Sequence, residues 1–382
     1  MRILYLCINS LIRQTSGPRV HVISVCRELS KLGHTVLLVH PKGNSFENEN
    51  NELGFKTLAL PPRFVLDDKP IINRIVTDIL YTVIISIFRP QFIYERENGR
   101  RSMVSFSNIL NIPRIVELNG WELRRKKTGT LLENEQADIE RFNNNFKGAK
   151  AIICSSPGVR NKVLEYINIE KDRVFFIPNG VDVEKFSPPK TGNKIDRARV
   201  IIGYIGGFTD TQDIKTILDA ISILINECIQ LELRMIGPAQ HELLEMISSR
   251  KLSGYIKIYG PLPNKQLPAE LWQMDICIAA YSRKLLETVG SLEGAMKIWE
   301  YWAACRPVIA TDIKSSESYH HHLEKRYIAV QPENPGDMAE AIRFLINHPK
   351  EKQKIASRGF EYARKNSWQN VVSKIESIML DK

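Results

Sequence analysis

Apolar residues along the chain fall into short continuous runs that alternate with segments of helical periodicity. The first run, residues 3–8, predicts a buried strand, and the helix after it is expected to begin at Pro18 and to end at Gly33. Further strands are predicted at residues 35–39, 92–95, 114–118, 151–155 and 174–177. Because strands and helices alternate throughout, the pattern predicts parallel sheets of the α/β class.

The same alternation starts again after a polar run at residues 190–199, which is typical of a linker. The first strand beyond it is predicted at residues 200–205, and Gly206-Gly207-Phe208 follows directly. Later strands are predicted at residues 231–236, 255–259, 275–279, 308–310 and 327–330. Two α/β halves of similar size result, and a ligand is expected beyond the carboxyl ends of their strands.

The domain boundaries follow from this pattern. Residues 1–188 form the first domain and residues 196–366 the second. The segment 367–382 is predicted to be a C-terminal helix that packs on either half, and a crossing back to the N-terminal domain is one of these two alternatives.

Composition limits the class of protein. Of 382 residues, 43% are hydrophobic and 25% are charged, as in an ordinary globular protein. The apolar stretch at residues 79–88 is too short to span a bilayer, so a core helix is the favoured interpretation and a membrane-surface helix the alternative. The cysteines form no CxxC pair and no zinc spacing, which indicates core residues in a reducing compartment. They are Cys7, Cys26, Cys154, Cys228, Cys277 and Cys305.

The formal net charge of +10 favours anionic partners, namely nucleic acid, anionic lipid or a phosphorylated substrate. Basic residues cluster at Arg96, Arg100 and Arg101 and again at residues 124–127. No aromatic residues are interleaved there to stack on bases, so nucleic acid is not expected as a partner. Phosphate-bearing ligands and an anionic membrane surface remain, with a solvated basic face as the alternative.

The segment that begins at Gly294 carries the clearest chemical signal. Gly294, Ala295 and Met296 predict a loop of small residues that opens a helix, whose N-terminus attracts anions. Lys297 adds a full charge in the first turn, and Glu300 lies three residues later on the same face. An anion fits the helix start and a polyol fits the carboxylate, and a nucleotide sugar has both groups.

Other motifs are weaker or missing. Gly206-Gly207 is a second candidate for phosphate contact, although a plain turn is the alternative. The chain lacks the GxGxxG, GxxxxGK[ST], GxSxG and HExxH motifs, which disfavours a dinucleotide enzyme and a P-loop NTPase. The run His320-His321-His322 is interpreted as a solvated loop, so no metal is expected.

Taken in order, these segments resemble glycosyltransferase family 4, which has the GT-B fold. The matching N-terminal pieces are Gly17 with His21, residues 29–36, Tyr94-Glu95-Arg96, residues 152–156 and residues 177–182. The matching C-terminal pieces are residues 203–208, Gly260, residues 275–281 and residues 297–310. The resemblance implies two Rossmann-like domains that face each other across a cleft, the first for the acceptor and the second for a nucleotide sugar.

The resemblance further implies a retaining enzyme that moves a sugar from a nucleotide diphosphate donor to a glycan or lipid-linked acceptor. Such an enzyme would act in cell-surface polysaccharide or glycolipid biosynthesis, in the cytoplasm or peripherally at the inner face of the cell membrane. It would need no metal and no cofactor, because backbone amides, a helix N-terminus and basic side chains hold the diphosphate. The alternatives are a non-catalytic GT-B scaffold or binding subunit and, less favoured, a nucleotide-sugar epimerase.

Site residues are implied in the same way. Glu300 matches the second glutamate of a paired-glutamate motif that binds the donor ribose, and Lys297 matches a lysine beside the diphosphate. Asn119 stands where many members carry a histidine near the reacting sugar, although an Asn-Gly turn is the alternative. The other donor-side residues are Gly206, Gly207, Phe208, Pro261, Tyr281, Gly294, Ala295 and Met296. The acceptor-side residues are Gly17, His21 and Arg96.

The chain departs from the family pattern at several of these positions. The first glutamate of the pair is replaced by Leu292, and Glu293, the remaining catalytic candidate, comes one residue late. Gly207 and Gln212 stand where many members carry Arg and Lys. The charge of a diphosphate would then rest on Lys297, with help from Arg283 or Lys284. Cys305 replaces a usual glycine.

Overall fold

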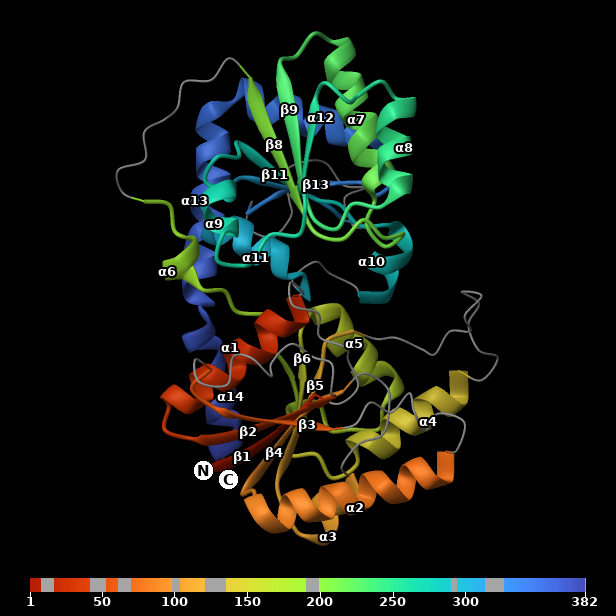
Figure 1. Ribbon diagram of the computed structural model, residues 1–382, viewed down its shortest axis with the longest axis vertical. Coiled ribbons are helices and arrows are strands. Elements are labelled where there is room, and N and C mark those ends of the chain that lie inside the picture. The colour runs from red at the N-terminus through yellow and green to blue at the C-terminus, as the bar shows by residue number, and fades with distance from the viewer. Residues whose placement is uncertain are drawn as a thin grey trace. The chain divides into compact units, whose positions relative to one another are not determined.

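The computed structural model describes residues 1–7, 17–41, 53–60, 70–97, 104–120, 135–189, 199–289, 294–312 and 326–381. The chain divides into two compact units, each built on its own parallel sheet (Figure 1). The first unit combines Met1–Pro178 with Trp368–Lys382, and the second is Asn179–Ser367.

The sheet of the first unit has seven parallel strands in the order β3-β2-β1-β4-β5-β6-β7. Every strand predicted in this half is present, but β3 was missed because it is a short edge strand with alternating, partly exposed residues. The strands are β1 (Arg2–Leu6), β2 (Thr35–Pro41), β3 (Lys56–Leu60), β4 (Phe92–Glu97), β5 (Arg114–Leu118), β6 (Ala151–Cys154) and β7 (Val174–Phe176).

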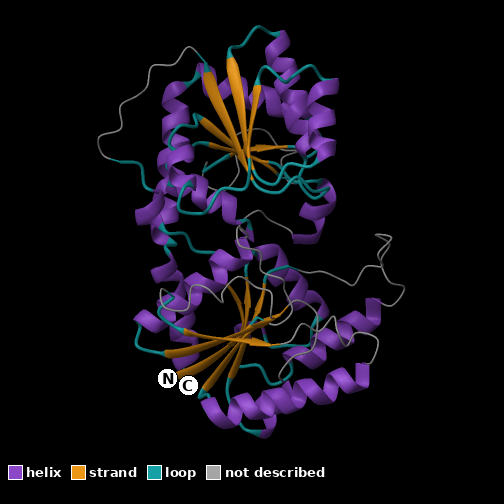
Figure 2. Cartoon of the chain, in the orientation of Figure 1, coloured by secondary structure: helices purple, strands orange, loops and turns teal. Residues whose placement is uncertain are grey.

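Helices cover both faces of this sheet, as a parallel sheet requires (Figure 2). They are α1 (Gly17–Lys31), α2 (Pro70–Phe88), α3 (Val104–Ile109), α4 (Glu135–Phe146), α5 (Pro157–Tyr166) and α14 (Trp368–Leu380). The last helix packs on α1, where His34 Nε2 lies 2.8 Å from Glu376 Oε1. It therefore belongs to the first unit although it comes last in the sequence.

The second unit has a six-stranded parallel sheet in the order β10-β9-β8-β11-β12-β13. All strands predicted in this half are present. They are β8 (Val200–Ile205), β9 (Leu231–Ile236), β10 (Ile256–Tyr259), β11 (Ile276–Ala279), β12 (Val308–Thr311) and β13 (Ile328–Val330). The helices are α6 (Val183–Phe186), α7 (Ile214–Asn226), α8 (His241–Ser249), α9 (Leu267–Leu271), α10 (Arg283–Val289), α11 (Met296–Ala303), α12 (Pro335–Asn347) and α13 (Pro349–Lys365).

Residues 179–188, which the sequence pattern grouped with the first half, make their contacts in the second unit. Phe186 lies in the apolar core there, and its carbonyl accepts a hydrogen bond from Trp272 Nε1 at 2.8 Å. The predicted linker at residues 190–199 lies outside the described residues except for Arg199.

Two cysteines correct the interpretation that all six are core residues. Cys228 is exposed and Cys305 is only partly buried, whereas the other four are buried. Both have a positive φ, of 61° and 53°, and each stands two residues after the last residue of its helix, α7 or α11. There each closes a helix with the paired backbone hydrogen bonds of a Schellman motif. Among the described residues, no helix is both long and apolar enough to cross a bilayer.

Candidate functional site

In the second unit, the turn after β8 brings the backbone close to Lys297. Gly206 has a φ of 151°, and a Cβ there would lie 2.6 Å from Lys297 Nζ. A Cβ on Gly237, after β9, would lie 1.9 Å from the carbonyl oxygen of Gly206. Close packing against the backbone therefore requires glycine at Gly237, and the positive φ favours glycine at Gly206. The predicted glycine segment and the predicted lysine segment meet at the carboxyl end of β8.

Lys297, in the first turn of α11, is held by neutral groups. Its Nζ donates to Gln212 Oε1 at 2.7 Å and to the Tyr204 hydroxyl at 3.2 Å. The same nitrogen lies 4.3 Å from the ring centroid of Tyr204 and 5.0 Å from that of Tyr281. Gln212 thus holds the lysine from the position where many family members carry a second cation.

The charge of Lys297 is poorly compensated. Burial lowers the pKa of Lys297 to about 7, and the attraction of Glu300 offsets only part of this. The cap residue Ala295 contributes no side-chain hydrogen bond to the start of α11. The helix N-terminus and the lysine therefore form one cationic region next to Gly206.

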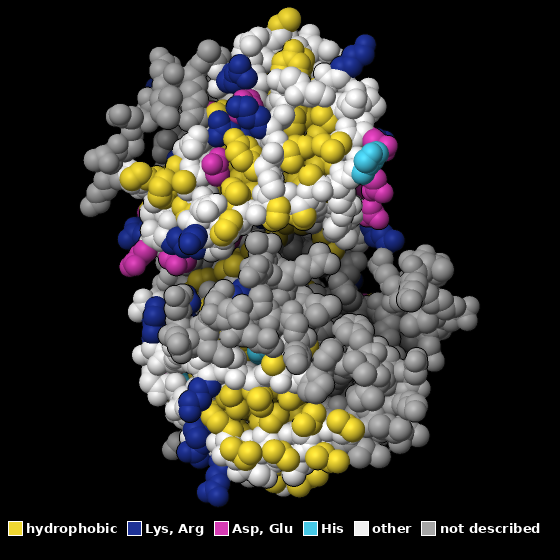
Figure 3. All heavy atoms as spheres, viewed as in Figure 1, with side chains coloured by type: hydrophobic (Ala, Val, Ile, Leu, Met, Phe, Trp, Pro, Cys, Tyr) yellow, Lys and Arg dark blue, Asp and Glu magenta, His cyan; other side chains and the backbone are white. Residues whose placement is uncertain are grey.

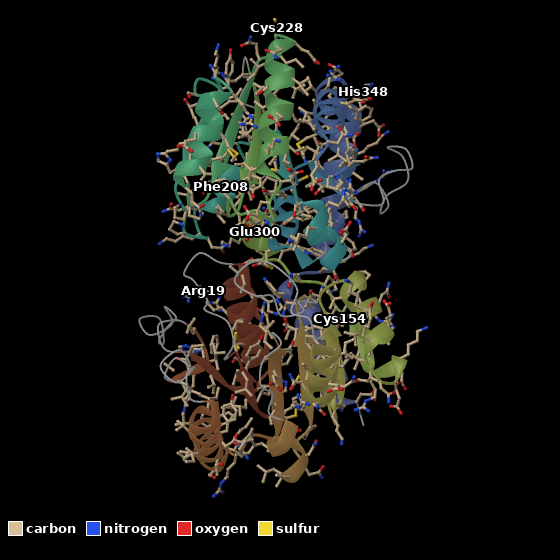
Figure 4. All side chains as sticks on the ribbon, turned by 90° about the vertical axis from the view of Figure 1, so that its right-hand side faces the viewer. Arg19, Cys154, Phe208, Cys228, Glu300 and His348 are labelled. Atoms are coloured by element: carbon tan, nitrogen blue, oxygen red, sulfur yellow. The ribbon has the colours of Figure 1, made fainter. Side chains whose placement is uncertain are left out.

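Glu300 is buried one turn further along α11. Its Oε1 accepts a hydrogen bond from Asn264 Nδ2 at 3.2 Å, and Asn264 Oδ1 in turn accepts one from Lys185 Nζ. Burial raises the pKa of Glu300 to about 7, against the opposing effects of Lys185, Asn264 and Lys297. Figure 4 labels Glu300 and Phe208, which lie at the same end of the second unit.

The remaining donor-side residues take different places in the second unit. Phe208 packs its ring 5.8 Å from Tyr204, and the backbone of Tyr281 is tied to the Thr311 hydroxyl. Gly294 O accepts a hydrogen bond from Asn179 Nδ2 at 2.8 Å, so the loop before α11 is anchored. Others are exposed, namely Pro261, Arg283 and Lys284. Leu292 and Glu293 lie outside the described residues.

In the first unit, Glu117 near the end of β5 is the centre of a buried polar cluster. Its Oε1 lies 2.8 Å from His21 Nε2 and accepts a hydrogen bond from Asn119 Nδ2 at 2.6 Å. Its Oε2 accepts a hydrogen bond from the Tyr94 hydroxyl at 2.6 Å. Arg96 is its register partner on β4. The cluster therefore brings His21 and Arg96, which were predicted for the acceptor side, together with Asn119, which was predicted to lie near the reacting sugar.

The charge on Glu117 is stabilised within the chain. Burial alone would raise the pKa of Glu117, but His21, Arg96 and the Tyr94 hydrogen bond outweigh it and hold the pKa well below its usual range. Tyr94 is fixed in turn by stacking on Tyr5, with ring centroids 4.7 Å apart. Because Asn119 donates through Nδ2, its Oδ1 is oriented as a hydrogen-bond acceptor.

Gly17 is the first residue of α1, one turn before His21. Glu117, Tyr94, Tyr204, Gln212 and Asn264 were not predicted as site residues. Glu117 carried a signal, since charged residues are unusual in a fully buried strand and β5 has two, Arg114 and Glu117. Gln212 was noted only as standing where many members carry a lysine. Tyr94, Tyr204 and Asn264 have no distinctive sequence signal, because their partners lie on other elements, namely β5 and α11.

Among the described residues, no group of three or more His, Cys, Asp and Glu side chains is placed to hold a metal ion. The run His320-His321-His322 and the basic residues Arg100, Arg101 and 124–127 lie outside the described residues.

Comparison with protein families decides the identity of this fold and site. The family model described as Glycosyltransferase Family 4 matches residues 15–185, and the model described as Glycosyl transferases group 1 matches residues 199–348. The chain belongs to the group 1, family 4 glycosyltransferases. It is thus an enzyme of the GT-B fold, with two Rossmann-like domains.

Curated relatives of this glycosyltransferase are distant. One is an uncharacterized glycosyltransferase of Methanocaldococcus jannaschii, 24% identical over 71% of this chain and 69% of that protein. Another is the putative teichuronic acid biosynthesis glycosyltransferase TuaH of Bacillus subtilis, 25% identical over 52% of this chain and 49% of that protein. The matched region thus spans about half of TuaH.

Solved structures agree on the fold of the glycosyltransferase. A glycosyltransferase from Rickettsia africae has a TM-score of 0.80 at 18% identity, covering 100% of this chain and 99% of that one. HepE of Anabaena, solved in complex with UDP-glucose, has a TM-score of 0.74 at 14% identity, covering 99% of both chains.

Proposed function

We propose that this enzyme transfers a sugar, with retention of anomeric configuration, from a nucleotide diphosphate donor to a glycan or lipid-linked acceptor. The observation that carries the proposal is Lys297, a half-buried cation whose described hydrogen-bond partners, Tyr204 and Gln212, are neutral. A lysine in this setting gains from a dianionic ligand, and the neighbouring helix N-terminus adds to the attraction.

The donor would be arranged along α11. Its diphosphate lies against Lys297, Gly206 and Gly207, where glycine allows close backbone approach. Its ribose hydroxyls bond to the Glu300 carboxylate, which has one side-chain hydrogen bond from Asn264. When the bond from the sugar carbon to the diphosphate oxygen breaks, negative charge grows on the leaving group, and Lys297 stabilises it.

The acceptor side is proposed for the Glu117 cluster. Asn119 Oδ1 accepts a hydrogen bond from a sugar hydroxyl, and Glu117 holds the amide in that orientation. Arg96 Nη1 is buried and has no hydrogen-bond partner among the described residues, so its N–H groups can donate a hydrogen bond to the acceptor substrate. Glu293 remains a proposed catalytic residue from the sequence alone.

The names of related proteins support the proposal. HepE was solved with UDP-glucose, which supports a nucleotide-sugar donor. TuaH is a putative teichuronic acid enzyme. A mutant of S. aureus TarM, with a TM-score of 0.65, was solved in complex with UDP. A role in cell-surface polysaccharide biosynthesis is therefore proposed, with neither metal nor cofactor.

The proposal is tested with a panel of nucleotide sugars that differ in base and in sugar. We expect one of them to release its nucleoside diphosphate in the presence of the enzyme without added metal and with chelator present. NMR of the product is expected to show the anomeric configuration of the donor. Absence of hydrolysis, of transfer and of calorimetric heat with every nucleotide would exclude this donor class.

A further inference from the structure

The surface of α2 carries an apolar stripe that the core of the first unit does not use. One face of the helix is buried in that core through Tyr81, Ile84 and Ile85. A second apolar face is exposed, with spacings of three and four residues that align its side chains along the helix. Its residues are Val76, Ile79, Val83 and Ile87, with exposed fractions of 37%, 56%, 49% and 79%. Packing of a helix on a core needs only the first face.

The short helix α3 extends this stripe. Its ring contact with α2, between Phe106 and Tyr81 with centroids 5.9 Å apart, places the two helices together. Ile109 and Leu110 are 80% and 47% exposed. We call the six exposed residues, four on α2 together with Ile109 of α3 and Leu110 directly after it, the α2/α3 surface. Figure 3 shows hydrophobic side chains gathered over this region. Such a contiguous patch marks an interaction site.

Basic side chains lie at one end of the α2/α3 surface. Arg89 directly follows α2 and is exposed, and Arg2 Nε donates to its carbonyl at 2.8 Å, which holds the two arginines together. Figure 3 shows Lys and Arg side chains along one edge of the hydrophobic patch. The chain as a whole has a net charge of +10. An anionic partner is therefore favoured.

We propose that the α2/α3 surface docks this enzyme on an anionic lipid bilayer. The helix α2 lies parallel to the membrane plane, with its aliphatic stripe at the acyl boundary and the two arginines among the headgroups. The stripe is entirely aliphatic, whereas the residues that dominate protein interfaces are Trp, Tyr and Arg in pockets. From Val76 to Ile87 it is about 16 Å long at the rise of an α-helix, which suits shallow insertion.

Vesicle co-sedimentation tests this proposal with the full chain. We expect binding to vesicles of phosphatidylcholine with phosphatidylglycerol, and at least tenfold weaker binding to phosphatidylcholine alone. Substituting Ile79→Asn and Ile87→Asn together is expected to reduce binding to the anionic vesicles about tenfold or more. Asparagine tolerates the positive φ of 50° at position 89, so Arg89→Asn is a suitable third variant. It is expected to reduce binding to the anionic vesicles less than the double substitution does, and to remove part of the salt dependence of that binding.

The matched control is Leu244→Asn, which removes a 52% exposed leucine from the second unit and is expected to leave vesicle binding unchanged. All variants are compared at equal folded fraction by circular dichroism. The proposal is overturned if the wild type binds no vesicles, or if the double variant binds as the wild type does. Concentration-dependent self-association that the double variant abolishes, without vesicle binding, would instead make this a protein interface. Each result is independent of whether the donor proposal holds.

Discussion

Each unit contains a buried glutamate at its polar cluster, and the two behave in opposite ways. Glu117 in the first unit has His21, Arg96, Tyr94 and Asn119 around it, and its pKa lies well below the usual range. Glu300 in the second unit has one side-chain hydrogen bond, from Asn264, and burial raises its pKa to about 7. Both carboxylates are buried to a similar degree, so the number of compensating partners explains why their pKa values shift in opposite directions.

This difference separates a preorganised cluster from an incomplete one. The first unit compensates the charge of the Glu117 carboxylate within the chain, so this carboxylate is oriented before any substrate binds. The second unit keeps Lys297 and Glu300 at pKa values shifted toward neutrality, and both gain when a ligand supplies the missing partners. The poorly compensated charges therefore reduce the stability of the second unit, and part of this free energy is recovered when the donor binds.

The largest expected effect is on stability, from Glu117→Gln. The uncharged amide leaves His21 and Arg96 without their anion, so the free energy of unfolding is expected to fall by about 3 kcal/mol at pH 7. Because the folded-state pKa lies below the unfolded value of 4.5, this difference is full above about pH 5 and shrinks as the pH falls toward 3.

Denaturant unfolding at several pH values measures this loss, and hydrogen exchange locates it in the first unit. The control is Glu361→Gln, which removes a partner from an exposed ion pair with Arg364 and is expected to change little. Equal losses at pH 3 and pH 7 would show that Glu117 is not ionised in the folded enzyme.

The next effect is on donor binding, from Lys297→Ala. Loss of a charge-assisted contact to the diphosphate is expected to weaken nucleotide-sugar affinity about 30- to 100-fold. Because Lys297 has a pKa of about 7, wild-type affinity is expected to fall as the pH rises from 6.5 to 8.5, and the variant should show no such slope. Calorimetry measures both, with Lys350→Ala, an exposed lysine on α13, as the control.

Glu300→Gln is expected to move stability and binding in opposite directions. Its folded-state pKa of about 7 exceeds the unfolded 4.5, so ionised Glu300 lowers stability increasingly between these pH values and fully above pH 7. The variant is therefore expected to be about 1–2 kcal/mol more stable than wild type at pH 8 and equal to it at pH 4.5. Donor affinity falls about tenfold. A variant that is less stable at pH 8 would contradict the contrast with Glu117.

The smallest effect concerns helix ends. In the first unit α1 ends on Gly33 with a φ of 86°, whereas α7 in the second ends on Cys228 with a φ of 61°. Cys228→Gly is expected to stabilise the protein by about 0.5–1 kcal/mol, because glycine adopts this conformation without strain. Cys305→Gly is expected to stabilise the protein less, because the Cys305 side chain is partly buried and its packing would be lost. Thermal unfolding ranks the two, and Gly33→Ala should be destabilising.

The sequence predicted most of the fold and about half of the candidate site. Alternating buried strands located every described strand except β3, which has a single buried residue. Lys297 and Glu300 were found because a helix start fixes their spacing. The role of Glu117 was not found, because its partners come from β4 and α1. Gln212 was noted only as the replacement of a lysine, because its partner Lys297 lies far along the chain in α11. The positive φ of Cys228 was not predicted either, because the residue is not a glycine and only the backbone geometry shows the conformation.

The placement of α14 in the first unit has a consequence for how the chain is made. The second unit is one continuous stretch, but the first is assembled from two segments that all of the second unit separates. His21, which contacts Glu117, packs edge-on against Trp368 of α14 at 5.2 Å. On the ribosome the second unit has all its residues while the Glu117 cluster still lacks this support. The second unit can therefore fold first, and the first unit completes its fold once α14 has been synthesised.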